Sequence, residues 1–165
     1  MRDEEWLGAL VLRGTREDEG PAVAELWLAS RKASYPLNPE GVHDDDDVRR
    51  HFSEVVLPYC QVIVAEHPND GLVGLLVLVS GFIEHLMVGP DREGRGLGGI
   101  LVSLAKAQSP DGLDLWTFQS NTRARALYER HGFVAVAMTE GDNEEGAPDV
   151  RYHWDPTDGP AGAVG

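Results

Sequence analysis

The sequence has little sulfur: a single cysteine, Cys60, stands among 165 residues, so no disulfide can form within the chain. A catalytic thiol would need an activating base beside it, and no such base is near Cys60 in the sequence. We therefore expect an inert, buried thiol. The histidines are scattered singly, so no spacing typical of a metal site is found and no metal is expected.

Basic residues are also scarce. The chain has 14 Lys and Arg residues against 28 Asp and Glu residues, which gives a formal net charge of −14 at pH 7. Such a chain repels phosphates, so no nucleic-acid partner is expected. It would attract a cationic small molecule or a basic peptide. A charge that serves only solubility explains the composition equally well.

Long apolar runs are absent as well. No segment approaches the roughly 20 apolar residues that cross a bilayer, and the acidic residues 1–5 lack the apolar core of a signal peptide. We expect a cytoplasmic protein without membrane contact. The length suits one domain, which we assign to residues 1–154. Residues 155–165 are rich in Pro, Gly and Ala, so we expect them to form a flexible tail.

Apolar periodicity and turn residues divide the domain into strands and helices. Strands are predicted at residues 7–12, 61–66, 72–80, 82–88, 113–118, 133–139 and 150–154. Helices are predicted at residues 21–30, 44–56, 97–107 and 121–131. The four aspartates at 44–47 could suggest a metal site, but acidic residues at a helix start explain them more simply.

The order of these elements predicts the fold class. Three successive strands with short turns form an antiparallel meander, and strand–helix–strand segments flank it. The fold is therefore α+β, with three layers in which a mixed, mostly antiparallel central sheet is flanked by helices.

A glycine-rich turn between a strand and a helix is the most informative motif. This glycine turn consists of Glu93, Gly94, Arg95, Gly96, Leu97, Gly98 and Gly99. Glycines let a ligand approach the backbone, and the N–H groups at a helix start favour an anion. Arg92 and Arg95 add positive charge in an acidic chain.

Two other interpretations of the glycine turn remain open. It could be a plain strand-to-helix turn that needs flexibility. Its spacing also matches a dinucleotide-binding fingerprint, but that fingerprint normally opens the first unit of a long parallel sheet. Here it follows an antiparallel meander, and only about two strands come before the acidic loop.

Two segments together resemble the GNAT family of N-acetyltransferases. Residues 86–90 with the glycine turn are similar to its acetyl-CoA signature, Arg/Gln-x-x-Gly-x-Gly/Ala. Residues 121–133 are similar to its second motif, Asn-x-x-Ala-x-x-x-Tyr-x-x-x-Gly-Phe. The segments occur in the family's order, and the resemblance covers residues 7–154. One departure is Glu93, which stands where the family usually has Arg or Gln; Arg92 or Arg95 could offset its charge.

The resemblance implies roles for individual residues. Backbone groups of Leu86, Met87 and Val88 would hold the pantetheine arm and the thioester carbonyl of acetyl-CoA, and the glycine turn would cradle the pyrophosphate. Asn121 would hydrogen-bond the cofactor. Tyr128 would contact the cofactor and protonate the departing thiolate; a tyrosine that only packs in the core is the alternative.

Transfer to an amine requires its neutral form, so a general base would help. The strand 82–88 offers Glu84, which we favour, and His85. Phe82, Leu86 and Val88 would share a face with Glu84, and Ile83 and Met87 a face with His85. Because both faces are apolar, the strand is expected to be buried, and burial would raise the pKa of Glu84 toward neutrality. Either side chain could instead be hydrogen-bonded structure, and a chain of waters could serve as the base.

The resemblance implies a bacterial enzyme, an acetyl-CoA-dependent N-acetyltransferase that acts by direct attack of a primary amine. The acceptor would be a small molecule or a peptide, and the protein a monomer or homodimer. The acidic loop at residues 140–149 could attract a cationic acceptor or simply be solvated. The alternative is a non-catalytic sensor or interaction module that binds acyl-CoA.

Overall fold

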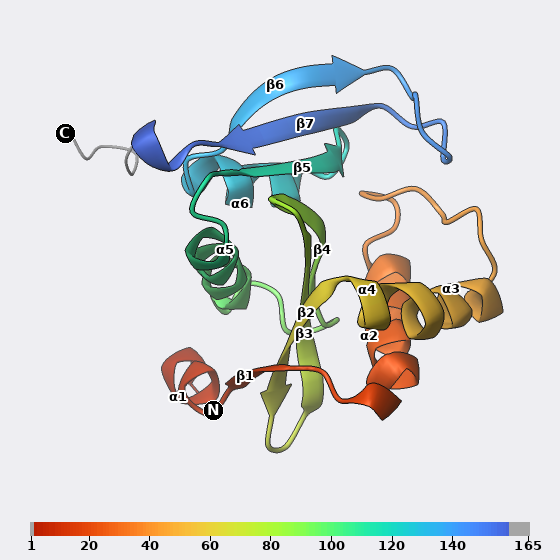
Figure 1. The fold of residues 1–165 in the computed structure, drawn as a ribbon, viewed down its shortest axis with the longest axis vertical. Helices are drawn as coiled ribbons and strands as arrows, with labels where there is room; N and C mark the ends of the chain where they lie inside the picture. The colour runs from red at the N-terminus through yellow and green to blue at the C-terminus, as the bar shows by residue number, and fades with distance from the viewer. Residues whose placement is uncertain (1, 159–165) are drawn as a thin grey trace.

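The computed structural model of the chain describes residues 2–158. It contains a seven-stranded sheet in the order β1-β2-β3-β4-β5-β7-β6 (Figure 1). The strands are β1 (Val11–Gly14), β2 (Gln61–His67), β3 (Gly71–Val79), β4 (Phe82–Val88), β5 (Leu113–Phe118), β6 (Val134–Thr139) and β7 (Asp149–Trp154). The longer helices are α2 (Gly20–Ala33), α5 (Leu97–Gln108) and α6 (Thr122–Arg130).

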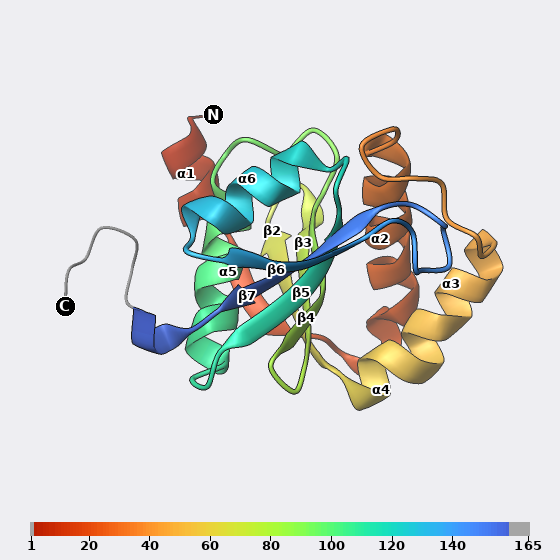
Figure 2. The same ribbon diagram turned by 90° about the horizontal axis from the view of Figure 1, so that it is seen from above.

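Strands β1 to β4 pair antiparallel, β5 pairs parallel to β4, and β7 pairs antiparallel with both β5 and β6. The sheet is therefore mixed and mostly antiparallel, which confirms the predicted fold class. Helices cover both of its faces: α1 (Asp3–Gly8) and α5 lie on one side and α2 and α3 (Asp45–His51) on the other (Figure 2).

Each face has its own apolar core. Leu76, Leu101 and Leu115 belong to the core under α5 and α6, and Val23, Phe52 and Leu75 to the core under α2 and α3. β3 supplies both cores because its side chains alternate between the two faces. It is buried from Val73 to Leu78.

The aspartate run begins a helix, as predicted. The Asp44 carboxylate accepts the Asp47 backbone N–H at 2.7 Å, which satisfies a donor that the first turn leaves unpaired. From α3 the helical path continues through a π-helical turn (η2, Phe52–Val56) into α4 (Leu57–Tyr59).

The prediction of a first strand at residues 7–12 is wrong in its first half. Residues Asp3–Gly8 form α1, and the strand is Val11–Gly14. The acidic side chains of Asp3, Glu4 and Glu5 favour a helix start because negative charge is attracted to the positive, N-terminal end of the helix dipole. Trp6 then anchors α1: its side chain is 2% exposed and donates a hydrogen bond to Asp70 at 2.8 Å.

Three smaller results concern helices and the chain end. Among residues 2–158, no helix combines the length and apolar character needed to cross a membrane. A short 3₁₀ helix, η3 (Pro156–Asp158), follows β7 and lies within the predicted tail. The Asp155 carboxylate accepts the Thr157 N–H at 2.9 Å. Residues 159–165 of that tail lie outside the described residues.

Candidate active site

Strands β4 and β5 separate after a short paired stretch. They pair only through Phe82 with Asp114 and Ile83 with Leu115. Beyond these two pairs the strands no longer hydrogen-bond to each other, and Leu86, Met87 and Val88 of β4 line a cavity. A strand edge without a neighbouring strand leaves backbone donors and acceptors for a ligand.

This first cavity has a volume of about 790 Å³, within the range of small-molecule sites. The glycine turn forms one side and α6 another, and Ser30, Ser34 and Asn38 contribute from α2 and the segment after it. Of the residues predicted to bind the cofactor, only Arg95 does not line this cavity: Leu86, Met87, Val88, Glu93, Gly94, Gly96, Leu97, Gly98, Gly99, Asn121 and Tyr128 all do.

The glycines of the turn serve two physical purposes. Gly94 and Gly96 have φ values of 80° and 101°, a left-handed region that favours glycine, and Gly96 caps α5. Gly98 lets α6 approach, since a Cβ there would lie 3.2 Å from a methyl group of Leu127. The first N–H groups of α5, which lack intrahelical partners, are therefore held at the cavity.

The charges around the turn differ from expectation. Arg92 pairs with Asp70 at 3.2 Å, and the Arg95 guanidinium lies over the Trp6 ring at 5.1 Å. Glu93 pairs with Arg123 of α6 at 3.8 Å. The charge of Glu93 is thus met by Arg123, which the sequence analysis did not consider, and by neither Arg92 nor Arg95.

Asn121 and Tyr128 occupy one side of α6. The Asn121 carboxamide oxygen accepts the Ala124 N–H at 3.1 Å, and its amide nitrogen donates to Asn38 at 3.2 Å. Tyr128 is 6% exposed and packs against Phe133 and Tyr152. Burial raises the pKa of the Tyr128 hydroxyl well above its usual range, so the hydroxyl keeps its proton at neutral pH.

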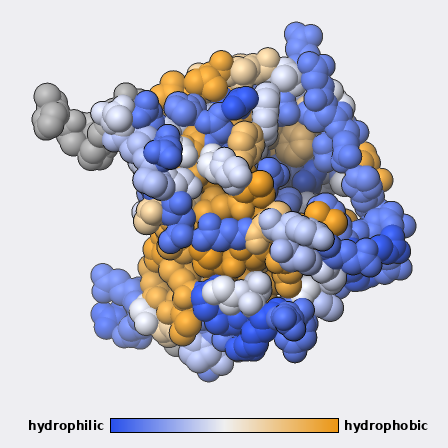
Figure 3. All heavy atoms as spheres, viewed as in Figure 1, coloured by the Kyte–Doolittle hydropathy of each residue, from blue (hydrophilic) through white to orange (hydrophobic). Residues whose placement is uncertain are grey.

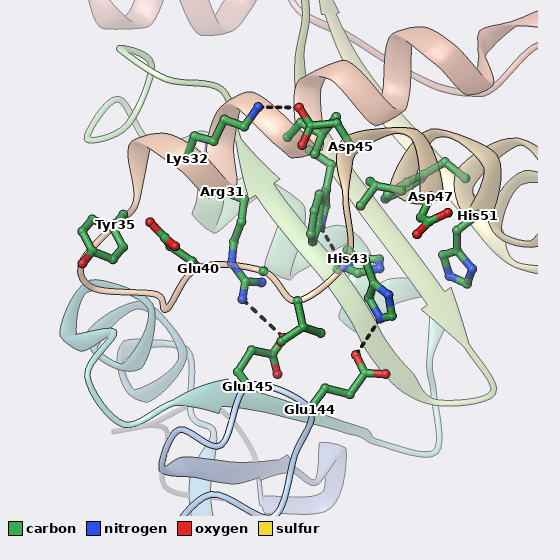
Figure 4. Close-up of a pocket in the computed structure, with 17 residues that line it drawn as sticks. Arg31, Lys32, Tyr35, Glu40, His43, Asp45, Asp47, His51, Glu144 and Glu145 are labelled. Carbon is green, nitrogen blue, oxygen red and sulfur yellow. Dashed lines mark hydrogen bonds and ion pairs between the residues drawn. The ribbon is translucent and has the colours of Figure 1, made fainter.

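A second cavity, of about 850 Å³, adjoins the first, and Tyr35 lines both. It lies between α2, α3, β4 and the loop before β7 (Figure 4). Trp27, Leu28, Val48 and Phe52 supply apolar surface, while Glu40, Asp45, Asp47, Glu144 and Glu145 supply carboxylates. Figure 3 shows hydrophilic residues covering the side of the molecule where α3 lies, at the right, with apolar residues exposed toward the centre.

His85 lines the second cavity, whereas Glu84 lines neither cavity. Burial, with repulsion from His51 and Arg31, lowers the pKa of His85 to about 4. Trp27 donates its indole N–H to Nδ1 of His85 at 3.2 Å. His85 is therefore a neutral imidazole at pH 7 whose remaining nitrogen, Nε2, carries the proton.

The expected burial of Glu84 is wrong. The pairing with β3 passes from Val77–His85 to Leu78–Ile83, so Glu84 is the extra residue of a β-bulge, and it is exposed. The bulge also changes the predicted faces. Ile83 packs with Leu86 and Val88 in one core, and His85 contacts the Phe52 ring of the other.

Several lining residues were missed from sequence. Arg31, Tyr35 and Glu40 come from the end of α2 and the loop after it, and that loop has no periodic pattern to mark a site. Trp27 lies within the helix predicted at residues 21–30, and only its contact with His85 reveals a second role. Among residues 2–158, no group of three or more His, Cys, Asp or Glu side chains is placed to hold a metal ion.

Comparison with known sequences agrees with this geometry. The model of the acetyltransferase (GNAT) domain matches residues 58–135, which include the β4–β5 separation, the glycine turn and α6. The peptidyl-lysine N-acetyltransferase YjaB of Escherichia coli is 29% identical over 133 residues, covering 80% of this chain and 87% of YjaB.

Two solved structures share the fold. The solution structure of apo YjaB from Escherichia coli has a TM-score of 0.70 at 23% identity, covering 88% of this chain and 97% of that one. Mutant forms of the spermidine/spermine N-acetyltransferase SpeG from Vibrio cholerae have a TM-score of 0.67 at 20% identity, covering 92% and 96%. Both structures are less than 25% identical to this chain, so they show a shared fold. The domain match and the similarity to YjaB show that the chain belongs to the GNAT family of acetyltransferases.

Proposed function

We propose that this chain binds acetyl-CoA in the first cavity, hereafter the cofactor cavity, and transfers its acetyl group directly to a primary amine held in the second cavity, hereafter the acceptor cavity. The observation that carries the proposal is that the two cavities adjoin on β4. His85 faces the acceptor cavity, Leu86 follows it in the cofactor cavity, and Tyr35 borders both.

Three parts of the cofactor cavity would each bind a different part of acetyl-CoA. The free edge of β4 at Leu86, Met87 and Val88 would pair with the pantetheine arm. The glycine turn would receive the pyrophosphate on its N–H groups, and the pyrophosphate would compete with Glu93 for Arg123. Asn121 would contribute its carboxamide, which already fixes the start of α6.

The reaction balances without a covalent enzyme intermediate. The amine nitrogen attacks the thioester carbonyl carbon, the C–S bond breaks, and the nitrogen loses a proton. Tyr128 would give its hydroxyl proton to the departing thiolate and regain one from solvent. Burial keeps the Tyr128 hydroxyl protonated at neutral pH, so the proton is present when the thiolate leaves, although the raised pKa also makes Tyr128 a weaker acid than a free tyrosine.

For the base, we favour a chain of waters over either side chain. Glu84 is exposed on the bulge and lines neither cavity. His85 lies at the transfer point, but its pKa of about 4 makes it a weak base and Trp27 occupies its free lone pair. Its role would be to stay neutral, so that it does not repel the acceptor ammonium, and to orient a water through Nε2–H.

The finer properties of the enzyme are part of the proposal. YjaB is named for peptidyl-lysine and SpeG for spermidine and spermine, so a small molecule and a peptide both qualify as acceptor classes. A cytoplasmic bacterial location and a monomeric or homodimeric state complete the proposal. Relatives in Escherichia coli and Salmonella typhimurium support the bacterial origin.

The decisive experiment incubates the protein with acetyl-CoA and a panel of amines and measures free thiol. Thiol release that depends on the amine is the expected result. Thermal stabilisation by acetyl-CoA without turnover on any amine would instead support the non-catalytic sensor. Stabilisation by NAD and not by CoA would overturn the proposal.

A further inference from the structure

Arg31 is a largely buried cation in the wall of the acceptor cavity. Its side chain is 14% exposed, and its guanidinium carbon lies 5.6 Å from the centroid of the Trp27 ring and 5.3 Å from that of the Phe118 ring. The two aromatic rings keep water away from much of the guanidinium. A charge that water screens poorly acts more strongly on its surroundings than a charge at the surface.

The charge of Arg31 is only partly compensated. Its Nη2 lies 3.5 Å from one oxygen of Glu145, and Figure 4 shows this single contact. Its Nε donates to the Pro39 carbonyl, which is neutral, at 3.2 Å. Burial lowers the pKa of Arg31, and the charge of Glu145 offsets only part of that effect. Arginine nevertheless stays charged in proteins at any ordinary pH, so a positive potential remains in the cavity.

This potential acts at the transfer point, where β4 passes from His85 in the acceptor cavity to Leu86 in the cofactor cavity. Arg31 covers the Trp27 ring, whose N–H group donates to Nδ1 of His85 at 3.2 Å. The groups that act on His85 by charge are His51 and Arg31, and both favour its neutral form. A histidine is charged only when protonated, so Arg31 supplies the permanent part. An amine nitrogen beside His85 would meet the same potential.

The carboxylates of the acceptor cavity do not cancel this potential. Asp45 is paired with Lys32 at 2.7 Å, and Asp47 is paired with Arg50 at 3.1 Å. Within residues 2–158, no carboxylate acts on His85 to raise its pKa. The transfer point is therefore electropositive although the chain as a whole is acidic.

Glu40 and Glu144 are exposed carboxylates that line the same cavity. Glu144 contacts His43 at 3.1 Å, and the side chains of both are more than half exposed. Solvent screens such charges, so their influence falls off toward the buried end of the cavity. The cavity thus attracts a cation at its exposed end and disfavours one at its buried end.

We infer that Arg31 holds the amine of the acceptor in its neutral, nucleophilic form at the transfer point, so that no side chain is needed as a general base. The ammonium group gives one proton to water on reaching the buried end of the cavity, and the neutral nitrogen attacks the thioester carbon. A second proton leaves the nitrogen for water as the C–S bond breaks and Tyr128 protonates the thiolate. A further positive charge at His85 would keep the ammonium group from entering. The inference rests on the proposed function, because it explains how the amine of that same site loses its proton.

The potential at the transfer point is measured first, by NMR titration of the His85 imidazole in the whole chain. Arg31→Gln removes the charge while its amide can still donate to the Pro39 carbonyl, so the pKa of His85 should rise toward its ordinary value of about 6.5. Arg49→Gln removes the same charge from α3, lines neither cavity and should leave that pKa unchanged. An equal pKa of His85 in the wild type and in Arg31→Gln would overturn the inference, whether or not the protein is active.

Kinetics then test the effect on the amine. The panel contains 2-phenylethylamine, spermidine and a lysine-containing peptide, and the acceptor that releases most thiol is used at saturating acetyl-CoA. At pH 7, Arg31→Gln should lower kcat about tenfold, because fewer bound amines are neutral. KM should not rise, because the ammonium form binds better without Arg31. At pH 9.5 the difference in kcat should shrink to about twofold, because most bound amines are then neutral in both proteins.

A loss of kcat that is equal at both pH values, or a higher KM, would show that Arg31 only supports the cavity wall, and the inference would fail. Two further variants separate charge from shape. Arg31→Lys retains the charge and should keep most of kcat at pH 7. Glu145→Gln removes the partial compensation and should raise kcat at pH 7 severalfold; a loss like that of Arg31→Gln would count against the inference.

The two proposals can fail separately. If the wild type acetylates no amine of the panel, the proposed function fails, and the NMR titration still decides whether Arg31 acts on the transfer point. If amines are acetylated but Arg31→Gln changes neither the pKa of His85 nor the pH dependence of kcat, the acetyltransferase stands and the inference fails.

Discussion

Tyr128 places its ring in the core between Phe133 and Tyr152 while it lines the cofactor cavity. Tyr128→Phe removes only the hydroxyl, so packing should be preserved. If Tyr128 is the acid, kcat should fall about 100-fold, a typical contribution of positioned proton transfer. The Kd for acetyl-CoA should stay within about twofold, because the ring keeps its contacts.

Steady-state kinetics and equilibrium binding check this prediction, with Tyr59→Phe as the control. Tyr59 is 82% exposed and lines neither cavity, so its variant should behave as the wild type. An unchanged kcat in Tyr128→Phe would mean that water protonates the thiolate and that Tyr128 serves packing alone.

His85, which lines the acceptor cavity, should make the free energy of unfolding depend on pH. Its pKa in the folded protein, about 4, lies below the unfolded value of about 6.5. Its contribution to the free energy of unfolding is thus complete above pH 6.5 and is lost as the pH falls through 4. Between pH 7.5 and pH 5 the wild type should lose up to about 2 kcal/mol from this residue.

Urea denaturation at both pH values, in the wild type and in His85→Asn, measures this loss. Asparagine can still accept the Trp27 N–H but does not titrate, so the variant should lose less stability. His131, whose pKa burial also lowers, accounts for part of the loss that remains. An equal loss in both proteins would show that His85 is protonated alike in the folded and unfolded states.

At the scale of elements, the glycine turn depends on a conformation that other residues adopt only with strain. Gly96 has a φ of 101° where it caps α5. Gly96→Ala should cost about 1–3 kcal/mol of stability. It should also weaken acetyl-CoA binding severalfold, because the N–H groups that follow Gly96 would turn away from the pyrophosphate.

The matched control is Gly8→Ala in α1, where an added Cβ meets no atom within 4 Å. Alanine is preferred to glycine in a helix by up to about 1 kcal/mol, so this variant should be as stable as the wild type or more stable. Thermal unfolding and acetyl-CoA titration of both variants test the prediction. Similar losses in both would contradict a special role for Gly96.

Most elements could be predicted from the sequence because their signals are local. Continuous apolar runs mark β2 and β3, and Gly132, with a φ of 84°, follows α6 at a position where glycine commonly ends a helix. The two failures have tertiary causes. The helix α1 is held in place by Trp6, which bonds Asp70, 64 positions away in the sequence. The bulge at Glu84 depends on how β3 pairs with β4. Neither feature can be predicted from the pattern of apolar residues along a single strand.

At the scale of the whole molecule, the two cavities were not equally predictable. The cofactor cavity follows the chain through residues 86–99 and 121–128, where two compact motifs lie. The acceptor cavity joins side chains such as Arg31 and Glu145, which are 114 positions apart. Such a cavity is a product of the folded sheet, so only its acidic character could be anticipated from the loop at residues 140–149.

The net charge of −14 predicts that the catalytic efficiency of the whole molecule toward a cationic amine depends on salt. Carboxylates at the acceptor cavity should draw a cationic amine in, and salt screens such attraction as the Debye length falls from about 10 Å at 0.1 M to about 3 Å at 1 M. At saturating acetyl-CoA, kcat/KM for 2-phenylethylamine should therefore fall about threefold to tenfold between low and high salt, with kcat nearly constant. Methoxyamine, which is uncharged at neutral pH, should show almost no dependence. If both amines respond equally, salt acts on the enzyme or its cofactor, and the carboxylates of the acceptor cavity do not steer the acceptor.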